Sequence, residues 1–149
     1  MKPASIFLAG ALLFGAAIAS HAACAATPDE IIAARRANQT RVQDLVKIVD
    51  TGLKSNAAAS ALVDQLKEID DREHLLKGYF PDGTQSGDTH ALPAIWTNRA
   101  GFNAIADRFV ADLDKALLLA KAGDTAGLTA QWAQATSNCG ACHRDFRAR

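Results

Sequence analysis

Two cysteines and a histidine lie close together near the end of the 149-residue chain, in the segment Cys139-Gly140-Ala141-Cys142-His143. On a helix, positions three residues apart share a face, so both sulfurs project to the same side. Sulfurs placed in this way can form thioethers with the two vinyl groups on one edge of a porphyrin, and the adjacent imidazole can then reach the iron. A Cys-x-x-Cys-His motif is typical of covalent c-type haem attachment.

Three other chemistries use the same residue types but explain the motif less well. A structural zinc site needs four ligands, but the sequence has no second cysteine pair, and His74 and His90 stand at no metal-ligand spacing from the motif. A redox dithiol lies at a helix N-terminus in an α/β chain, whereas this pair lies about fourteen residues into a predicted helix of an all-α chain. A structural disulfide suits an oxidising compartment but leaves His143 unexplained. The motif therefore favours covalent haem.

Residues 1–25 have the layout of a secretory signal peptide, followed by one domain over residues 26–149. Lys2 supplies a positive start, the run from Ile6 to Ile18 is apolar, and small residues follow. This run is shorter than the ~20 apolar residues of a membrane-spanning helix. We expect cleavage between residues 22 and 26, and export to a bacterial periplasm.

Cys24 lies in this cleavage region, where a lipid-bearing cysteine would anchor the protein to a membrane. The residues before it, His21-Ala22-Ala23, lack the leucine usual at the start of a lipidation box. We therefore expect Cys24 to be lost with the signal peptide or to lie beside its cleavage site.

The composition excludes two classes of partner. The chain has 16 basic and 16 acidic side chains, and Lys2 is the one charged residue of the leader, so the exported domain has 15 basic against 16 acidic residues, a net charge of about −1. The sequence has no stripe of basic residues of the kind that binds nucleic acid. No second apolar run indicates a membrane span.

Apolar residues recur at helical spacing in four segments. The segments are residues 28–50, a stretch from Ser55 or Asn56 to just before Gly78, a stretch from Pro93 to Gly123, and residues 125 onward. The last of these has an expected inward face formed by Leu128, Trp132, Ala135, Cys139, Cys142, His143 and Phe146. No segment shows the period of two that is typical of strands. The sequence therefore predicts an all-α, antiparallel four-helix bundle with covalent haem near its C-terminus.

Local signals set the expected helix boundaries. Thr27 can cap the first helix in a capping box with Glu30, and Pro28 suits its first position. Asp124 or Thr125 can cap the last helix. Residues 78–93 form a connection that is long for a bundle, with Pro-Asp-Gly turn chemistry.

Over the whole exported region the sequence resembles the cytochrome c′ family of periplasmic four-helix haem proteins. The similarity rests on the motif near the C-terminus, followed by Phe146-Arg147, and on "FPDGT" at 80–84, "AIW" at 94–96 and "PDEIIAARR" at 28–36. It implies one covalent haem c, with thioethers at Cys139 and Cys142 and the iron bound by His143.

The opposite side of the iron decides between electron carriage and gas binding. A Met/His pair would give a low-spin electron carrier, but Met1 is the only methionine and belongs to the predicted leader. His74 lies among charged residues and His90 lies in the long connection, so we expect both at the surface. We therefore expect a five-coordinate, high-spin iron.

The resemblance also assigns residues around the expected haem. It places Arg35 at the haem propionates and Gln39, one turn later, over the open face of the iron, where low-spin relatives have Met. The neighbours Asn38 and Thr40 are also polar, so the register could differ by one position. Arg35 could instead form an exposed charged pair with Arg36, for which we expect a solvated position.

Arg147, one turn after His143, is expected on the proximal side of the haem, where it also meets the dipole of the last helix. The large aromatic residues Phe146 and Trp132 are expected in the core, and Trp96 and Phe102 beside the ring.

The predicted function is binding of small diatomic gases, NO first and CO second, with protection against NO as a role. The alternative is a low-potential electron-transfer cytochrome. No acid/base pair stands beside the motif, so we expect no enzyme. The resemblance implies a homodimer formed through the first two helices. Redox partners cannot be read from the sequence.

Overall fold

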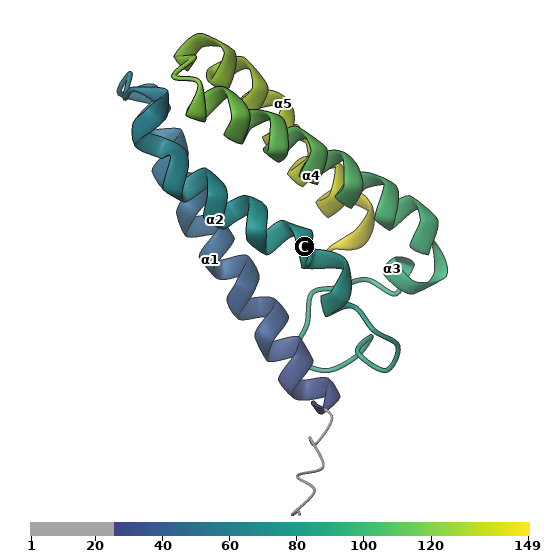
Figure 1. Cartoon of the computed structure of the whole chain (residues 1–149). Coiled ribbons are helices and arrows are strands. Elements are labelled where there is room, and N and C mark those ends of the chain that lie inside the picture. Colours follow the sequence, from purple (N-terminus) through teal and green to yellow (C-terminus); the bar gives the residue numbers. More distant parts are fainter. Residues whose placement is uncertain (1–25) are drawn as a thin grey trace, which may run out of the picture.

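The computed structural model describes residues 26–149, which form an all-α structure as predicted. The predicted signal peptide, its cleavage site and Cys24 lie outside the described residues. Four long helices form an antiparallel bundle in which α1 lies beside α2 and α4 beside α5 (Figure 1). The elements are α1 (Pro28–Lys54), η1 (Ala59–Leu62), α2 (Val63–His74), η2 (Leu76–Tyr79), α3 (Ala94–Thr97), α4 (Arg99–Lys121) and α5 (Thr125–Phe146). No helix within residues 26–149 is both long and apolar enough to cross a membrane.

The first helix begins at the predicted capping box. The Thr27 hydroxyl accepts a hydrogen bond from the Glu30 backbone N–H, and the Glu30 carboxylate accepts one from the Thr27 N–H at 2.7 Å. Two of the backbone donors at this helix end are thereby satisfied. The helix continues to Lys54, four residues beyond the predicted end at residue 50.

The second helix begins later than predicted. Asn56 has φ 56°, a left-handed conformation that ends α1, and Ala59–Leu62 then form a 3-10 turn before α2 begins at Val63. The predicted start at Ser55 or Asn56 was therefore wrong. The helical stretch toward Gly78 is also divided, since α2 ends at His74 and a 3-10 helix spans Leu76–Tyr79.

The third predicted helix is broken near its start. The side chain of Asn98 accepts a hydrogen bond from the Gly101 backbone N–H at 3.2 Å, so Asn98 caps a new helix instead of continuing the old one. The result is the single turn α3 followed by the long helix α4. The end near Gly123 is confirmed by its φ of 74°, and Asp124 caps α5 through the Gly127 N–H.

The long connection between η2 and α3 closes one end of the bundle (Figure 1). It crosses to the last residues of the chain, where the Leu92 N–H donates to the Phe146 carbonyl at 3.0 Å and the Ala148 N–H donates to the His90 carbonyl at 2.8 Å. This pairing fixes the connection against the C-terminal end of α5, beside the Cys-x-x-Cys-His motif.

The core consists of two clusters of buried residues. The larger lies along α1, η1, α2, α4 and α5 and includes Leu45, Leu66 and Leu113, each at most 2% exposed. The smaller is mostly aromatic and joins Phe80, Ile95, Phe102 and Phe146. Cys139 packs against the larger cluster and Cys142 against the smaller one, so the motif lies where the two clusters meet.

Candidate functional site

The Cys-x-x-Cys-His motif occupies the last two turns of α5 and faces a cavity of about 320 Å³. The side chains of Cys139, Cys142 and His143 all line this cavity. The other lining comes from α1, from the end of α2 and η2, from the long connection, from α3 and from α4. Helical spacing alone places both sulfurs on this wall, because residues three apart share a face.

The two thiols are free and half-buried. Burial raises the pKa of each thiol to about 11, and the nearby Glu73 carboxylate contributes in the same direction. A redox dithiol and a zinc ligand both need a lowered thiol pKa, because the thiolate is the reactive form. These surroundings therefore disfavour the dithiol and zinc alternatives and leave two neutral thiols available for thioether formation.

His143 lies on the solvent-accessible side of the motif, in the last turn of α5. Partial burial lowers its pKa, and the positive charge of Arg147 adds to the effect. Both causes favour neutral imidazole, which is the form that binds a metal. Arg147 follows α5 as its C-cap residue and lines the same cavity.

Arg35 is nearly fully buried, with 4% of its surface exposed, so it does not form an exposed pair with Arg36. Its guanidinium donates to the Tyr79 carbonyl at 3.2 Å, to the Thr84 carbonyl at 3.4 Å and to the Thr89 hydroxyl at 2.8 Å, and it lies 4.5 Å from the centre of the Phe80 ring. None of the ion pairs among residues 26–149 includes Arg35. A buried cation without an acidic partner therefore lines the cavity and holds the long connection in place.

Gln39 lines the cavity one turn after Arg35, and its amide Nε2 donates a hydrogen bond to Oε1 of Glu73 at 3.0 Å. Glu73 also lines the cavity and is 3% exposed. Burial raises the pKa of this carboxyl to about 7, although the hydrogen bond from Gln39 opposes the shift. The wall formed by α1 and α2 is therefore polar and carries a carboxyl that changes charge near neutral pH.

The polar residues next to Gln39 on α1 do not take its place in the cavity wall. Asn38 is buried outside the cavity lining, and its Oδ1 accepts a hydrogen bond from Arg72 at 3.0 Å. Thr40 lines the cavity but is exposed, and Arg36 is exposed in an ion pair with Asp88. Within this stretch, Gln39 is the half-buried residue of the cavity wall.

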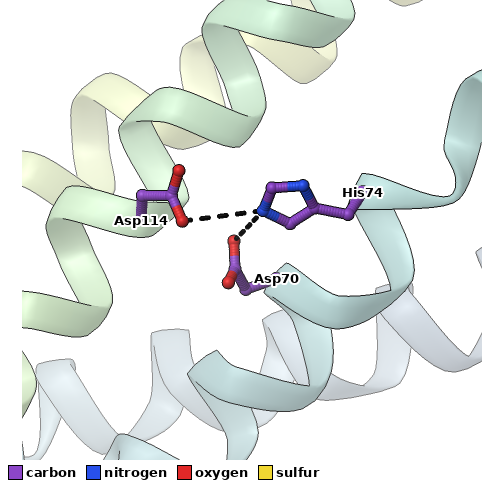
Figure 2. A group of neighbouring side chains, drawn as sticks. All are labelled: Asp70, His74 and Asp114. Atoms are coloured by element: carbon purple, nitrogen blue, oxygen red, sulfur yellow. Dashed lines mark ion pairs between the residues drawn. The ribbon is translucent and has the colours of Figure 1, made fainter.

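The two other histidines within residues 26–149 lie in different surroundings. His74 is half-exposed and lies outside the cavity, with its Nε2 at 3.5 Å from Asp70 Oδ1 and 3.6 Å from Asp114 Oδ1 (Figure 2). His90 is exposed on the rim of the cavity, where its carbonyl binds the chain end. His74 is therefore an ion-pairing residue between α2 and α4.

The aromatic residues divide between core and cavity partly as predicted: Trp132 and Phe102 lie where expected, Phe146 is buried but also lines the cavity, and Trp96 does not line it. Trp132 is buried in the larger core cluster, and its indole N–H donates to Asp50 at 2.7 Å. Phe102 and Phe146 line the cavity with ring centres 5.5 Å apart. Trp96 packs on Phe80 at the edge of the smaller cluster and is absent from the cavity lining.

Sequence reasoning missed Glu73 and the anchoring role of Thr84. Glu73 stands four residues after Ile69 and three before Leu76, where the apolar stripe of the second helix requires a core residue. A charged residue at such a position was the available signal. Thr84 is 1% exposed and binds Arg35 from a connection whose path the sequence pattern did not reveal.

The lining of the cavity fits a haem. One part is apolar and aromatic, with Phe80, Phe102 and Phe146, and suits a porphyrin ring. The guanidinium groups of Arg35 and Arg147 suit the propionate groups of a haem. With two thiols and an imidazole on the last helix, the fold and site together define a helical-bundle protein of the c-type haem class.

Comparison with known proteins places the chain within this class. The sequence model of the cytochrome c′ family matches residues 30–147. Cytochrome c′ of Rhodopseudomonas palustris is 34% identical over 123 residues, covering 80% of this chain and 83% of the relative. Cytochrome c′ of Rubrivivax gelatinosus is 41% identical over 69 residues, covering 46% of this chain and 54% of the relative.

Solved structures agree with the sequence matches. The crystal structure of the Rubrivivax gelatinosus protein aligns with a TM-score of 0.75 at 29% identity, covering 80% of this chain and 96% of that one. The nitric oxide complex of a mutant cytochrome c prime from Alcaligenes xylosoxidans aligns with a TM-score of 0.77 at 25% identity, covering 83% and 98%. The chain therefore belongs to the cytochrome c′ family. This family consists of periplasmic, non-enzymatic haem proteins that carry one covalent haem c.

Proposed function

We propose that this chain binds NO and CO at a coordination position of its haem iron that the protein leaves free, and that it protects against NO. Cys139 and Cys142 would hold the haem through thioether bonds, and His143 would be the axial ligand. When bound, the haem supplies an iron that coordinates a diatomic molecule.

One observation carries this proposal. Met1 is the only methionine in the chain, so the domain over residues 26–149 contains none to act as a sixth ligand. The wall formed by α1 and α2 presents the amide of Gln39 and the carboxyl of Glu73 instead. Neither group is among the axial ligands usual for haem in electron-transfer proteins.

The relatives support the choice of ligand. The Alcaligenes xylosoxidans protein, 25% identical to this chain, has been crystallised with nitric oxide in one variant and with carbon monoxide in another. The apolar part of the cavity, lined by Phe102, Ala106 and Phe109, suits small neutral molecules, because burying a charge there without a partner would be costly.

The other charged and polar residues would position the haem. Arg35 is held by the long connection before any haem binds, so its charge would meet a propionate without much loss of side-chain freedom. Arg147 would lie on the His143 side and favour the neutral imidazole. Gln39 would lie on the ligand side.

The primary test is titration of the reduced haem-loaded protein with NO, followed by its Soret absorption. We expect a spectral change and weakening of the bond between the iron and His143, because NO weakens the bond opposite to it. Electron paramagnetic resonance of the ferric protein should show a high-spin centre. An unchanged Soret band, or a low-spin ferric centre, would overturn the proposal.

A gain-of-ligand variant tests which residue faces the ligand side. The change Gln39→Met should convert the ferric spectrum to low spin and slow NO binding, because a thioether becomes available on that wall. The matched control is Gln43→Met, one turn further along α1 on the same cavity wall. It should leave the spectrum unchanged; equal spectra for both variants would reject the placement of Gln39.

Electron transfer is a second candidate, favoured by one observation. Gly140 and His143 are exposed and Cys142 is half-buried, so the haem edge bound here would lie near solvent and a redox partner. A low-spin ferric centre together with rapid electron exchange would favour this candidate over gas binding.

We propose that residues 1–25 are a signal peptide, which agrees with the periplasmic location of the family. N-terminal sequencing of the exported protein would locate the cleavage site and the fate of Cys24.

We also propose a homodimer through α1 and α2. Ile48 of α1 and Leu75 after α2 are large apolar residues that are 46% and 60% exposed, and one structural neighbour is a cytochrome c′ with ligand-controlled dimer dissociation. Light scattering of the wild type and of Ile48→Lys, with and without CO, would test the dimer.

A further inference from the structure

Glu73 is an unusual residue for a haem cavity, because it is a buried acid without a cation. It is 3% exposed, and none of the ion pairs among residues 26–149 includes it. Its hydrogen-bond partner in this part of the chain is the amide of Gln39, at 3.0 Å. The pair joins α1 to α2 across one wall of the cavity.

The hydrogen bond between Glu73 and Gln39 can form in two ways, depending on whether the carboxyl is ionised or protonated. An ionised carboxylate only accepts hydrogen bonds, so it holds an N–H of Gln39 and turns the amide group toward itself. A protonated carboxyl can donate its O–H to the amide oxygen of Gln39. In that second state the amide oxygen is taken and both amide N–H groups are released from Glu73.

We propose that Glu73 is a positioning residue that sets which end of the Gln39 amide faces a ligand in the cavity. When Glu73 is protonated, Gln39 offers N–H groups and the site favours ligands that accept a hydrogen bond, such as water or a polarised diatomic. When Glu73 is ionised, this donor is withdrawn. The inference rests on the proposed function, in which Gln39 lies on the ligand side of the haem.

Other charged groups near the cavity leave Glu73 free to change its protonation state. The Arg35 guanidinium is committed to the long connection, and Arg36 is paired with Asp88. The wall formed by α4 contributes the apolar residues Phe102, Ala106 and Phe109. From α5 and the connection, the titratable or charged groups that line the cavity are Cys139, Cys142, His143, Arg147 and His90.

The expected direction of the pH effect follows from burial. Because burial raises the pKa of Glu73 to about 7, both states are populated near neutral pH. Lowering the pH through this range protonates Glu73 and provides the Gln39 donor. Affinity for a ligand that accepts a hydrogen bond should therefore rise as the pH falls.

The experiment uses CO bound to the reduced, haem-loaded protein at roughly pH 6 and pH 8. The C–O stretching frequency measured by infrared spectroscopy reports a nearby hydrogen-bond donor, and CO affinity is measured in parallel. We expect the wild-type frequency to change between the two pH values, with affinity about two- to tenfold higher at the lower pH, the contribution of one hydrogen bond. Glu73→Gln should abolish the pH response, and Gln39→Leu should remove the donor state at both pH values.

The matched control is Asp70→Asn, which removes a buried acid of the same helix that does not line the cavity. It should keep the wild-type pH response. A further readout needs no added ligand: the C=O absorption of a protonated carboxylic acid should appear as the pH falls through neutrality and be lost in Glu73→Gln.

The outcomes separate the two proposals. CO binding with the same pH-independent spectrum in the wild type, Glu73→Gln and Gln39→Leu would overturn this inference and leave the proposed function intact. A wild type that binds no CO would overturn the proposed function and this inference with it. If Glu73→Gln does not fold, Gln39→Leu alone tests this inference, because the pH response of the C–O frequency and of CO affinity must vanish in that variant.

Discussion

Helix α2 carries two buried acids, one on each of two faces, and their surroundings differ. Asp70 is 7% exposed and lies on the side of α2 that faces α4, where His74 of α2 is 3.6 Å from Asp114 of α4 (Figure 2). Glu73 is 3% exposed and points into the cavity, where its partner is the neutral amide of Gln39. Both acids have a raised pKa, mainly because of burial.

The difference lies in what opposes the cost of burial. The Asp114 carboxylate raises the pKa of Asp70 further, but His74 beside it supplies a positive charge that lowers this pKa in part, and the cluster reaches solvent through His74, which is about half exposed. Glu73 has no such charge, and its pKa reaches about 7. A buried carboxyl without a cation lowers stability at neutral pH, so a role in the cavity is a more economical explanation for Glu73 than a role in packing.

The largest expected effect is on the pH dependence of stability. The pKa of Glu73 in the folded chain, about 7, exceeds the usual 4.5, so the folded state holds its proton more tightly. This contribution to stability is complete below about pH 4.5 and is lost as the pH rises to about 7. At pH 8, Glu73→Gln should therefore be more stable than the wild type by at most about 3 kcal/mol.

Urea unfolding of the haem-loaded protein at about pH 5 and pH 8 would measure this difference. Asp70→Asn should show the same sign with a smaller change, because His74 offsets part of the cost. Equal pH dependence in the wild type and Glu73→Gln would show that the two acids do not differ in the way described.

The second effect concerns the bond between Gln39 and Glu73. Because the Gln39 amide lowers the pKa of Glu73, Gln39→Leu should raise it further and move the loss of stability to higher pH. At pH 8 the variant should lose about 1.5 to 2 kcal/mol, the lower part of the range for a hydrogen bond to a charged group. The same unfolding series would measure it.

Gln43→Leu is the matched control for this change. Gln43 also lines the cavity from α1, and it makes no side-chain hydrogen bond to another residue of 26–149. It should leave the pH dependence unaltered. A similar shift of the pH dependence in both variants would mean that added apolar area, rather than the lost hydrogen bond, raises the pKa of the Glu73 carboxyl.

The helical bundle and the position of the two thiols could be predicted from the sequence. The stripe of leucine, isoleucine and alanine residues predicted the bundle, and the Cys-x-x-Cys-His motif predicted the wall on which the thiols lie. Both signals are local, because helical spacing alone decides which residues share a face. The capping box at Thr27 was local in the same sense and was confirmed.

What was missed depends on contacts between distant segments. The burial of Asp70 and of Glu73 was missed, because their charged neighbours along the sequence hid their places on the buried faces of α2. The start of α2 and the break at Asn98 depend on side-chain and turn choices that the apolar pattern permits in more than one way. The anchoring of Arg35 by Thr84 joins positions 49 residues apart, which no helical period encodes.

A smaller effect is expected at the solvent side of the Asp70 cluster. His74→Ala removes the cation that offsets the burial of Asp70, so the pKa of Asp70 should rise further. The variant should lose under about 1 kcal/mol, since His74 is half-exposed and the pair is screened. Thermal unfolding in low and high salt would measure this loss, which should shrink with added salt. A loss of the same size in low and high salt would assign it to packing instead of charge.

The smallest effect is expected at Glu68, a third acid of α2, although it forms close ion pairs with two cations. Its carboxylate lies 2.6 Å from Arg41 and 2.8 Å from Arg72, and these two cations lower its pKa to about 2. This stabilisation is present above the usual value near 4.5 and is lost as the pH falls toward 2. Because solvent reaches the pairs, Glu68→Gln should change the melting temperature at pH 7 less than the substitutions at Glu73, Gln39 or His74, and added salt should abolish the difference. A change in melting temperature larger than that of Glu73→Gln would mean that the length of an ion pair affects stability more than burial does on this helix. That result would contradict the contrast drawn between Glu73 and Asp70.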